Sequence, residues 1–264
     1  MRNSFIQLHM PVVTFTCDFG IRDYYLAALK GSVLTLTPDA TLVDISVTSK
    51  QYDIREAAYT FRNSFDYFPK GTIHVLHVNS AEAVGRLLVS ILNGQYIVSF
   101  DNGLLALAFG NVPSETYEVN EELKLDDGLG LFRTIARVVD LLAKEYQPTD
   151  FCHPAVNVRS YRMLQAMYSP GLIKAVVVYI DDYGNAILNI SKTEFEKHVG
   201  NKRFTIQAKM GQTNFIANNY SDAEEGDFVC VFNRAGLLEL AINKGRASSL
   251  LGLNIDSVVL ITIE

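Results

Sequence analysis

The chain of 264 residues has few of the features that mark membrane, secreted or nucleic-acid-binding proteins. Its three cysteines, Cys17, Cys152 and Cys230, are far apart and odd in number, so they form neither a metal-binding spacing nor a disulfide framework. No apolar run approaches the roughly 20 residues that a membrane helix needs, and the first residues lack a signal-peptide core. The formal net charge is -6, whereas phosphate-backbone binding needs clustered lysine and arginine. We expect a cytoplasmic protein with no membrane or nucleic-acid partner.

The common catalytic motifs are also missing. The chain has no G-x-S-x-G elbow, no P-loop and no G-x-G-x-x-G. His74 and His77 are three residues apart in a predicted strand, so they point to opposite faces and make a poor metal pair. His9, His153 and His198 have no partner at short spacing. We therefore expect no metal site and no cofactor.

The first part of the chain alternates strands and helices. Asn93-Gly94 is a strong hairpin signal between two strands, and Asp53 to Glu56 is typical of a capping box that opens a helix. The expected strands are 12–16, 41–45, 72–78, 87–92, 96–100 and one near Tyr117, and the expected helices are 24–36, 53–65, a short one after Gly103, and 132–145. This alternation predicts a largely parallel sheet covered by helices.

The pattern changes after Tyr146. An irregular stretch rich in turn residues follows, and beyond it come short strands with little helix between them. The expected later strands are 174–180, 186–190, 203–208, 228–232, 237–242 and 257–263. The sequence therefore predicts an α/β domain with a mostly parallel sheet over 1–150, a linker over 151–172, and a smaller all-β, barrel-like domain over 173–264.

Asp18 is the most informative polar residue in the chain. It follows the buried strand 12–16 directly and precedes the chain-breaking Gly20. Ligands bind outside the carboxyl ends of strands in open α/β sheets, and a carboxylate there can accept two hydrogen bonds from a vicinal diol such as a ribose. The alternative is that Asp18 only caps the turn or the following helix.

Polar residues also collect at three later turns. These are Asp101-Asn102-Gly103, the segment 181–185 (DDYGN) and the segment 233–236 (NRAG), each next to apolar strands. Taken singly, each turn has an ordinary explanation as a tight hairpin, because Asn, Asp and Gly are the standard turn residues.

Together with their surroundings, these turns resemble the S-adenosylmethionine hydroxide adenosyltransferases, relatives of the enzymes that put fluoride or chloride on the same substrate. The resemblance covers nearly the whole chain. Each matching motif is short and weak by itself, and the order and spacing of the motifs make the resemblance specific. The pieces are 16–20 (TCDFG) with Asp23, 44–46 (DIS), 53–58 (DIREAA), 68–72 (FPKGT), 101–105 (DNGLL), 180–185 (IDDYGN) and 239–247 (ELAINKGRA).

The resemblance implies a homotrimer whose active sites lie between the α/β domain of one subunit and the β domain of the next. It implies a reaction in which water or hydroxide attacks the ribose 5′ carbon of S-adenosylmethionine, so that methionine leaves and adenosine is released. The leaving sulfonium is already cationic, so positioning and desolvation of the nucleophile should supply most of the acceleration.

The resemblance also implies roles for individual residues in substrate binding. Asp18 would bind the ribose hydroxyls, while Asp23 and Asp181 would face the methionine ammonium. Asn185 would hydrogen-bond the adenine, helped by backbone groups from Ile242 to Lys244. No cofactor follows from this chemistry.

The chain departs from the family where its hydrolases carry an Asp–Arg–His set for the attacking water. Arg86 matches the arginine, but Asn79 stands in place of the acid and Leu131 in place of the histidine. A neutral amide and an alkyl group cannot take a proton from water. His77, on the same strand face as Asn79 if the strand continues, is the nearby candidate base. The expected catalytic set is therefore Arg86, Asn79 and His77.

Two further departures concern the halide site of the relatives and the carboxylate of the substrate. Phe132 falls where the halide-using relatives have a serine, and a phenyl ring cannot donate to a halide. Arg234 stands where the hydrolases tend to have serine, and a guanidinium can bind a substrate carboxylate through two hydrogen bonds. Two alternatives to hydrolysis stay open: a nucleoside-binding protein without turnover, and an enzyme that uses a related nucleoside.

Overall fold

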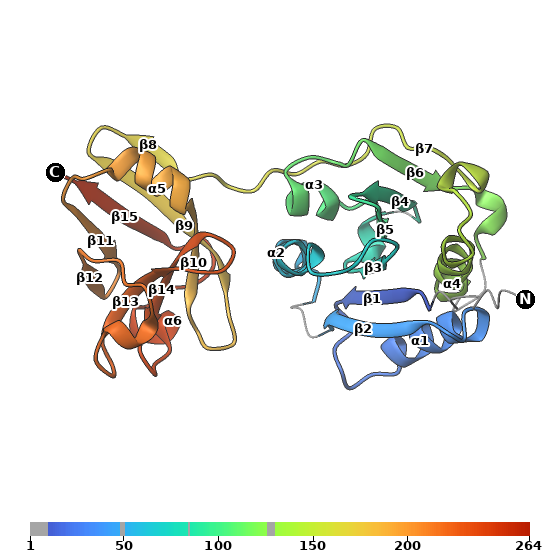
Figure 1. Ribbon diagram of the computed structural model, residues 1–264, viewed down its shortest axis with the longest axis horizontal. Helices are drawn as coiled ribbons and strands as arrows, with labels where there is room; N and C mark the ends of the chain where they lie inside the picture. Colours follow the sequence, from blue (N-terminus) through green and yellow to red (C-terminus); the bar gives the residue numbers. More distant parts are fainter. Residues whose placement is uncertain (1–9, 48–50, 84, 126–129) are drawn as a thin grey trace, which may run out of the picture. The chain divides into compact units, whose positions relative to one another are not determined.

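The chain folds into two compact units, Met1–Arg162 and Met163–Glu264 (Figure 1). The computed structural model describes residues 10–47, 51–83, 85–125 and 130–264. The division between the units falls inside the range 151–172 that the sequence predicts as a linker. No helix in these described ranges is both long and apolar enough to cross a membrane.

The first unit is built on one sheet of seven strands in the order β2-β1-β3-β5-β4-β6-β7. Neighbours among β2, β1, β3 and β5 are parallel, and the remaining pairs are antiparallel. The strands are β1 Val12–Cys17, β2 Thr41–Ser46, β3 Ile73–His77, β4 Leu87–Leu92, β5 Gln95–Phe100, β6 Glu115–Val119 and β7 Cys152–Pro154. This arrangement confirms the predicted α/β architecture, and β7 adds a strand that the sequence pattern did not predict.

Four helices cover the two faces of this sheet. α1 (Tyr25–Leu36) packs with α4 (Gly130–Ala143) on one face, and α2 (Ile54–Phe65) packs with α3 (Leu104–Phe109) on the other. The predicted cap of α2 is present, because the side chain of Asp53 accepts hydrogen bonds from the backbone of Arg55 and Glu56.

The order of the strands reverses direction at β1. The chain runs from β1 outward to β2 and then returns past β1 to form β3 on its other side. The loops that follow β1 and β3 are therefore neighbours at the carboxyl ends of these strands. Such a topological switch point is where open α/β sheets bind ligands.

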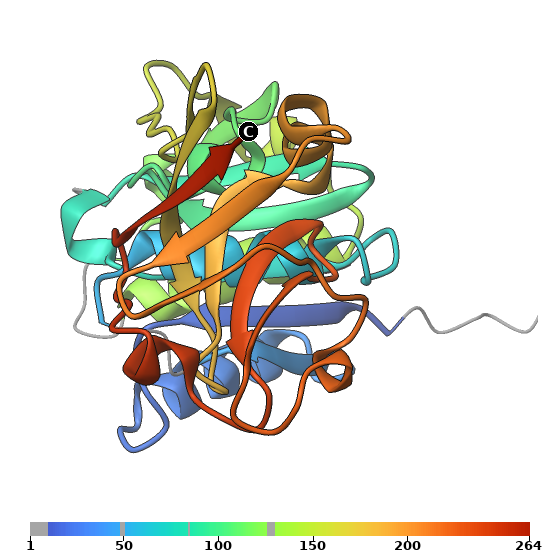
Figure 2. The same ribbon diagram turned by 90° about the vertical axis from the view of Figure 1, so that its left-hand side faces the viewer.

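The second unit is an antiparallel sheet in the order β12-β11-β15-β9-β10-β14-β13, with β8 beside β9. Its strands, dark yellow to red in Figure 2, curve so that a Cβ on Gly211 in β12 would lie 3.4 Å from the ring of Phe228 in β13. The approach of the two end strands confirms the barrel-like domain. The strands are β8 Met167–Ser169, β9 Leu172–Ile180, β10 Ala186–Ser191, β11 Phe204–Ala208, β12 Gly211–Thr213, β13 Phe228–Phe232, β14 Leu237–Ile242 and β15 Val258–Ile263.

Two helices in this unit were not expected from the sequence, α5 (Lys192–Val199) and α6 (Ala247–Leu250). The start of α5 is fixed by the hydroxyl of Ser191, which accepts a hydrogen bond from the backbone of Glu194 at 3.2 Å. Its apolar contacts are made by Phe195 and Val199, which pack against the sheet core.

Two histidines on β3 are buried on opposite faces of the first sheet, as the spacing predicts. The ring nitrogens of His74 lie 2.7 Å from Thr14 Oγ1 and 2.8 Å from Gln95 Oε1. The ring of His77 packs among Phe19, Phe100 and Phe132. Neither of its ring nitrogens has a hydrogen-bond partner among the described residues. Burial lowers the pKa of both imidazoles to about 4.

These two histidines predict an acid-sensitive fold. Because their folded pKa values of about 4 lie below the ordinary 6.5, the unfolded chain binds more protons between those values. The free energy of unfolding should therefore fall as the pH falls from 6.5 to 4, by about 2 kcal/mol per histidine at pH 4.5. Urea denaturation from pH 7 to 4.5 measures this.

His77→Leu should show a shallower loss of stability with pH than the unaltered protein. His153→Leu, at an exposed histidine, is the matched control and should keep the full pH dependence. An unchanged slope in His77→Leu would show that His77 does not titrate differently in the two states.

Candidate functional site

Three loops of the first unit converge on one carboxylate at the switch point. Asp18 directly follows β1, and its Oδ2 accepts hydrogen bonds from the backbone N–H of Asn79 after β3 and of Tyr52 after β2, both at 3.0 Å. No described residue donates to Oδ1, and the side chain is half-buried. Asp18 thus holds the three loops together through one of its carboxylate oxygens.

The loop after β3 differs from the sequence expectation. β3 ends at His77, and Asn79 has a φ of 46° in the left-handed region. The strand does not continue, so the expectation that His77 and Asn79 share one strand face is wrong. Asn79 contributes its backbone N–H to Asp18, whereas the ring of His77 packs against Phe19 in the aromatic cluster. Asp23 is exposed, five positions after Asp18, in the bend that leads into α1.

Arg86 forms ion pairs with two acidic side chains. Its Nε and Nη2 donate to Glu118 Oε2 at 2.9 and 2.7 Å, and its Nη1 donates to Asp101. Nη2 also donates to the carbonyl of Val156 at 3.0 Å. These hydrogen bonds raise the pKa of Arg86 and lower the pKa of the Glu118 carboxyl. The guanidinium therefore ties β4, β5 and β6 to the segment after β7.

The Asp101-Asn102-Gly103 turn links neighbouring strand ends. Asn102 donates from Nδ2 to the carbonyl of Val78 at 2.7 Å, and its Oδ1 accepts from the backbone of Leu104 at the start of α3. Gly103 has a φ of 89°, and a Cβ there would lie 2.2 Å from the ring of Tyr161. The turn needs glycine both for its backbone conformation and for this close approach.

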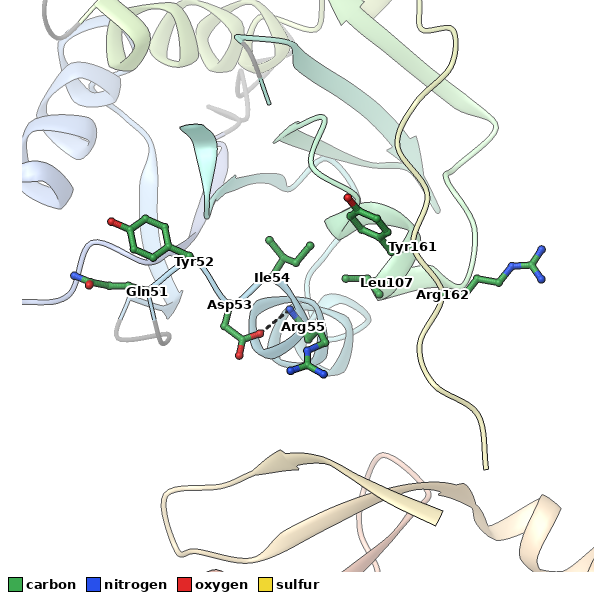
Figure 3. A pocket seen from close by; sticks show the side chains of 8 residues that line it. All are labelled: Gln51, Tyr52, Asp53, Ile54, Arg55, Leu107, Tyr161 and Arg162. Atoms are coloured by element: carbon green, nitrogen blue, oxygen red, sulfur yellow. Dashed lines mark hydrogen bonds between the residues drawn. The ribbon is translucent and has the colours of Figure 1, made fainter. Parts of the chain in front are cut away.

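A cavity of about 470 Å³ lies beside this turn in the first unit. Figure 3 shows that its walls come from the start of α2, from Leu107 of α3, and from the segment at Tyr161. It is lined by Gln51, Tyr52, Asp53, Ile54, Arg55, Leu107, Tyr161 and Arg162. Tyr52 lines this cavity and its backbone N–H also bonds to Asp18, so the cavity adjoins the loops at the carboxyl ends of the strands.

The second unit contains a larger cavity of about 670 Å³. Its lining includes four binding residues predicted from the sequence, Asp181, Asn185, Ile242 and Lys244. The other lining residues are Asp182, Tyr183, Tyr220, Asn243, Gly245 and Arg246. The turn after β9 and the end of β14 are 55 or more residues apart in the sequence, and sheet pairing between β10 and β14 brings them together.

Asp181 and Asn185 form a closed turn on the wall of this cavity. Asp181 Oδ1 accepts from the backbone N–H of Asn185 at 2.8 Å, and its Oδ2 accepts from Asn185 Nδ2 at 3.1 Å. Arg246 covers the turn, since it donates to the carbonyl of Asp182 at 2.9 Å. A Cβ on Gly184 would lie 2.9 Å from Arg246 Cβ, so glycine permits this contact.

Sequence reasoning missed Glu239 as a site residue. Its side chain is 3% exposed and accepts a hydrogen bond from the hydroxyl of Tyr220 at 2.7 Å. Burial raises the pKa of its carboxyl. An acidic residue inside an apolar strand is the one signal that could have identified it, because such a residue needs a buried partner.

Arg234 and Lys244 are both exposed. Arg234 occupies the turn between β13 and β14, where Asn233 Oδ1 accepts from the backbone of Ala235 and Leu237, and it is not among the residues that line the 670 Å³ cavity. Lys244 lines that cavity and pairs with Glu225 at 2.7 Å. Within the described ranges, no group of three or more His, Cys, Asp or Glu side chains is arranged to hold a metal ion.

Both units match one family of enzymes. Residues 13–144 match the SAM hydroxide adenosyltransferase N-terminal domain, and residues 175–260 match the SAM hydroxide adenosyltransferase C-terminal domain. The chain belongs to the SAM hydroxide adenosyltransferase family. The matched range in the first unit contains the loops around Asp18, and the matched range in the second unit contains the turn of Asp181.

Relatives of known activity in this family align over nearly the whole chain. The (R)-S-adenosyl-L-methionine hydrolase of Methanocaldococcus jannaschii is 28% identical, with 94% of this chain and 93% of the relative covered. The enzyme of the same name from Thermus thermophilus is 26% identical, with coverages of 92% and 96%. A fluorinase from Actinoplanes sp. is 23% identical, with coverages of 88% and 91%.

Two solved structures share the fold. An uncharacterized conserved protein from Thermotoga maritima has a TM-score of 0.82 at 22% identity, covering 95% of this chain and 99% of that chain. A conserved hypothetical protein from Thermus thermophilus has a TM-score of 0.73 at 26% identity, with coverages of 97% and 100%. The fold is therefore shared with these solved structures over at least 95% of the chain.

Proposed function

We propose that this protein hydrolyses S-adenosylmethionine to adenosine and L-methionine. The observation that carries the proposal is the position of Asp18 at the switch point, where one of its carboxylate oxygens holds three loops together. The full-length similarity to enzymes named (R)-S-adenosyl-L-methionine hydrolase supports the same reaction.

In this proposal each end of the substrate has its own group of residues. Asp18 accepts hydrogen bonds from the ribose hydroxyls, and Asn185, with the backbone from Ile242 to Lys244, binds the adenine. Asp23 and Asp181 face the ammonium of the methionine. The guanidinium of Arg234, which is exposed on its turn, pairs with the substrate carboxylate.

The reaction needs little covalent work from the protein. The water oxygen bonds to the ribose 5′ carbon while the bond from that carbon to sulfur breaks, and the electron pair neutralises the sulfonium as methionine leaves. The water loses one proton, and the leaving group needs none. Holding water in line with the breaking bond, away from bulk solvent, is therefore the main contribution.

Three residues are proposed to act on the water. His77 is the base, because its imidazole is neutral at pH 7 with a pKa of about 4 and no described residue bonds to its nitrogens. Asn79 and Arg86 position the site: Asn79 through its backbone bond to Asp18, and Arg86 through its bonds to Asp101 and Glu118.

We also propose a cytoplasmic homotrimer with a small-molecule substrate. Each active site would combine the Asp18 half of one subunit with the Asn185 half of the next, because adenine and ribose contacts are divided between the two units of the chain. Nucleic acid has no place in this reaction.

The first prediction concerns turnover. Purified protein incubated with S-adenosylmethionine should release adenosine and methionine in equal amounts, as separated by chromatography. His77→Leu should slow the reaction by about 100-fold and leave adenosine affinity unchanged. If the folded protein binds adenosine but releases neither product, hydrolysis is overturned and a nucleoside-binding protein is favoured. If His77→Leu keeps full turnover, His77 is excluded as the base.

The second prediction is that different residues bind the nucleoside end and the methionine end of the substrate, which calorimetric titration can test. Asp18→Ala should weaken adenosine binding by about 100-fold, since it removes charge-assisted hydrogen bonds, and leave methionine affinity unchanged. Arg234→Ala should weaken methionine binding and leave adenosine affinity unchanged. Each variant controls for the folding of the other, and a loss of both ligands in either variant would contradict the assigned role.

The third prediction tests whether a site is shared between subunits. Asp18→Ala and Asn185→Ala should each be inactive alone. When the two variants are co-expressed and assemble at random, about one quarter of the sites would combine an intact Asp18 with an intact Asn185. Activity near that fraction supports the shared site, and sedimentation should report a trimer. Complete inactivity of the mixture would place both residues of each site in one subunit.

A further inference from the structure

One peptide group connects the loop after β3 to Asp18. The carbonyl of Val78 and the N–H of Asn79 belong to this same planar group, so they point in opposite directions. The N–H donates to Asp18 Oδ2 at 3.0 Å, and the carbonyl accepts a hydrogen bond from Asn102 Nδ2 at 2.7 Å. Asp18 and Asn102 therefore hold the two ends of one peptide group from opposite sides.

The side-chain amide of Asn102 is itself held in one orientation. Asn102 is buried, and its Oδ1 accepts a hydrogen bond from the backbone N–H of Leu104 at 3.1 Å. A reversed amide would place its NH₂ against this N–H and its oxygen against the carbonyl of Val78, so neither hydrogen bond could form. A directed series of hydrogen bonds thus runs from Leu104 through Asn102 and the peptide group to the carboxylate of Asp18.

The peptide group needs this support because it lies beyond the end of β3, which is at His77. Asn79 has a φ of 46°, a left-handed conformation that most residues other than glycine avoid. If the peptide group turned over, the carbonyl of Val78 would face the carboxylate of Asp18, and these two acceptors would repel each other. The hydrogen bond from Asn102 favours the orientation in which the N–H faces Asp18.

We infer that Asn102 is a positioning residue that keeps the N–H of Asn79 directed at Asp18 and thereby orients the carboxylate for the two hydroxyls of a ribose. This inference rests on the proposed function, in which Asp18 binds the ribose. Because Asn102 is buried, it acts through the peptide group rather than by contact with the substrate. A carboxylate that is already oriented loses less conformational freedom when a diol binds to it.

The test compares the binding of adenosine and of 2′,3′-dideoxyadenosine, which lacks both ribose hydroxyls, by calorimetric titration. Unaltered protein should prefer adenosine by about 100-fold, since the diol forms charge-assisted hydrogen bonds with Asp18. Asn102→Asp keeps the shape of the side chain and the acceptor for Leu104, but it removes the donor to Val78. The preference for adenosine should then fall by about tenfold, and the affinity for 2′,3′-dideoxyadenosine should stay within about threefold.

A second substitution and a matched control accompany this variant. Asn102→Ala removes the same donor without adding an acceptor, so it should lower the preference by about threefold or more even where Asn102→Asp does not fold. Asn189 in β10 makes the same pair of bonds elsewhere: it accepts from the N–H of Val176 at 2.8 Å and donates to the carbonyl of Leu164 at 2.7 Å. Asn189→Asp should therefore keep the full preference for adenosine.

A double variant tests whether Asn102 acts through Asp18. Asp18→Ala should bind the two nucleosides equally, and the addition of Asn102→Asp should not weaken adenosine binding further, because the carboxylate that Asn102 orients is already absent. A further tenfold loss of adenosine affinity in the double variant would show that Asn102 acts independently of Asp18, which would overturn the inference.

The remaining outcomes separate this inference from the proposed function. Equal weakening of both nucleosides in folded Asn102 variants would show a merely structural role and overturn the inference, as would equal affinities in the unaltered protein. If S-adenosylmethionine is hydrolysed but the preference does not depend on Asn102, the inference fails and the proposed function stands. If the preference depends on Asn102 but no adenosine is released, the inference is upheld and hydrolysis fails.

Discussion

The arrangement of the loops in the first unit depends on one oxygen atom. Asp18 Oδ2 accepts the backbone N–H groups of Asn79 and Tyr52, so the loops after the three neighbouring strands β1, β2 and β3 share one acceptor. Backbone donors at a strand end must find a partner, and here the partner is a carboxylate side chain. In the proposed function, the carboxylate would thus be oriented before substrate arrives, which would lower the entropic cost of binding.

Carboxylate acceptors also organise the cavity of the second unit. There the half-buried Asp181 accepts from Asn185, and the buried Glu239 accepts from Tyr220. Such acceptors fix the direction of the amide and of the hydroxyl, because a reversed group would leave a buried polar atom unpaired. In both units, residues proposed to bind substrate are held by hydrogen bonds to a carboxylate.

Much of the architecture was predictable because local signals were strong. The β-branched runs, the Asn93-Gly94 hairpin and the Asp53 cap placed most elements close to their observed bounds. The elements that were missed have weak local signals. β7 and β12 are three residues long and exist through pairing with a neighbour. α5 has few apolar positions, and its cap and core contacts stabilise it.

The sequence by itself determined the fold class and the residue types that could bind a nucleoside, because periodicity and turn chemistry are local properties. Only the tertiary structure decided which of those residues meet. It ended β3 at His77, paired Arg86 with two acidic side chains, and joined the buried Glu239 to Tyr220. These arrangements follow from strand order and register, which bring together segments 15 to 61 residues apart and which no local pattern encodes.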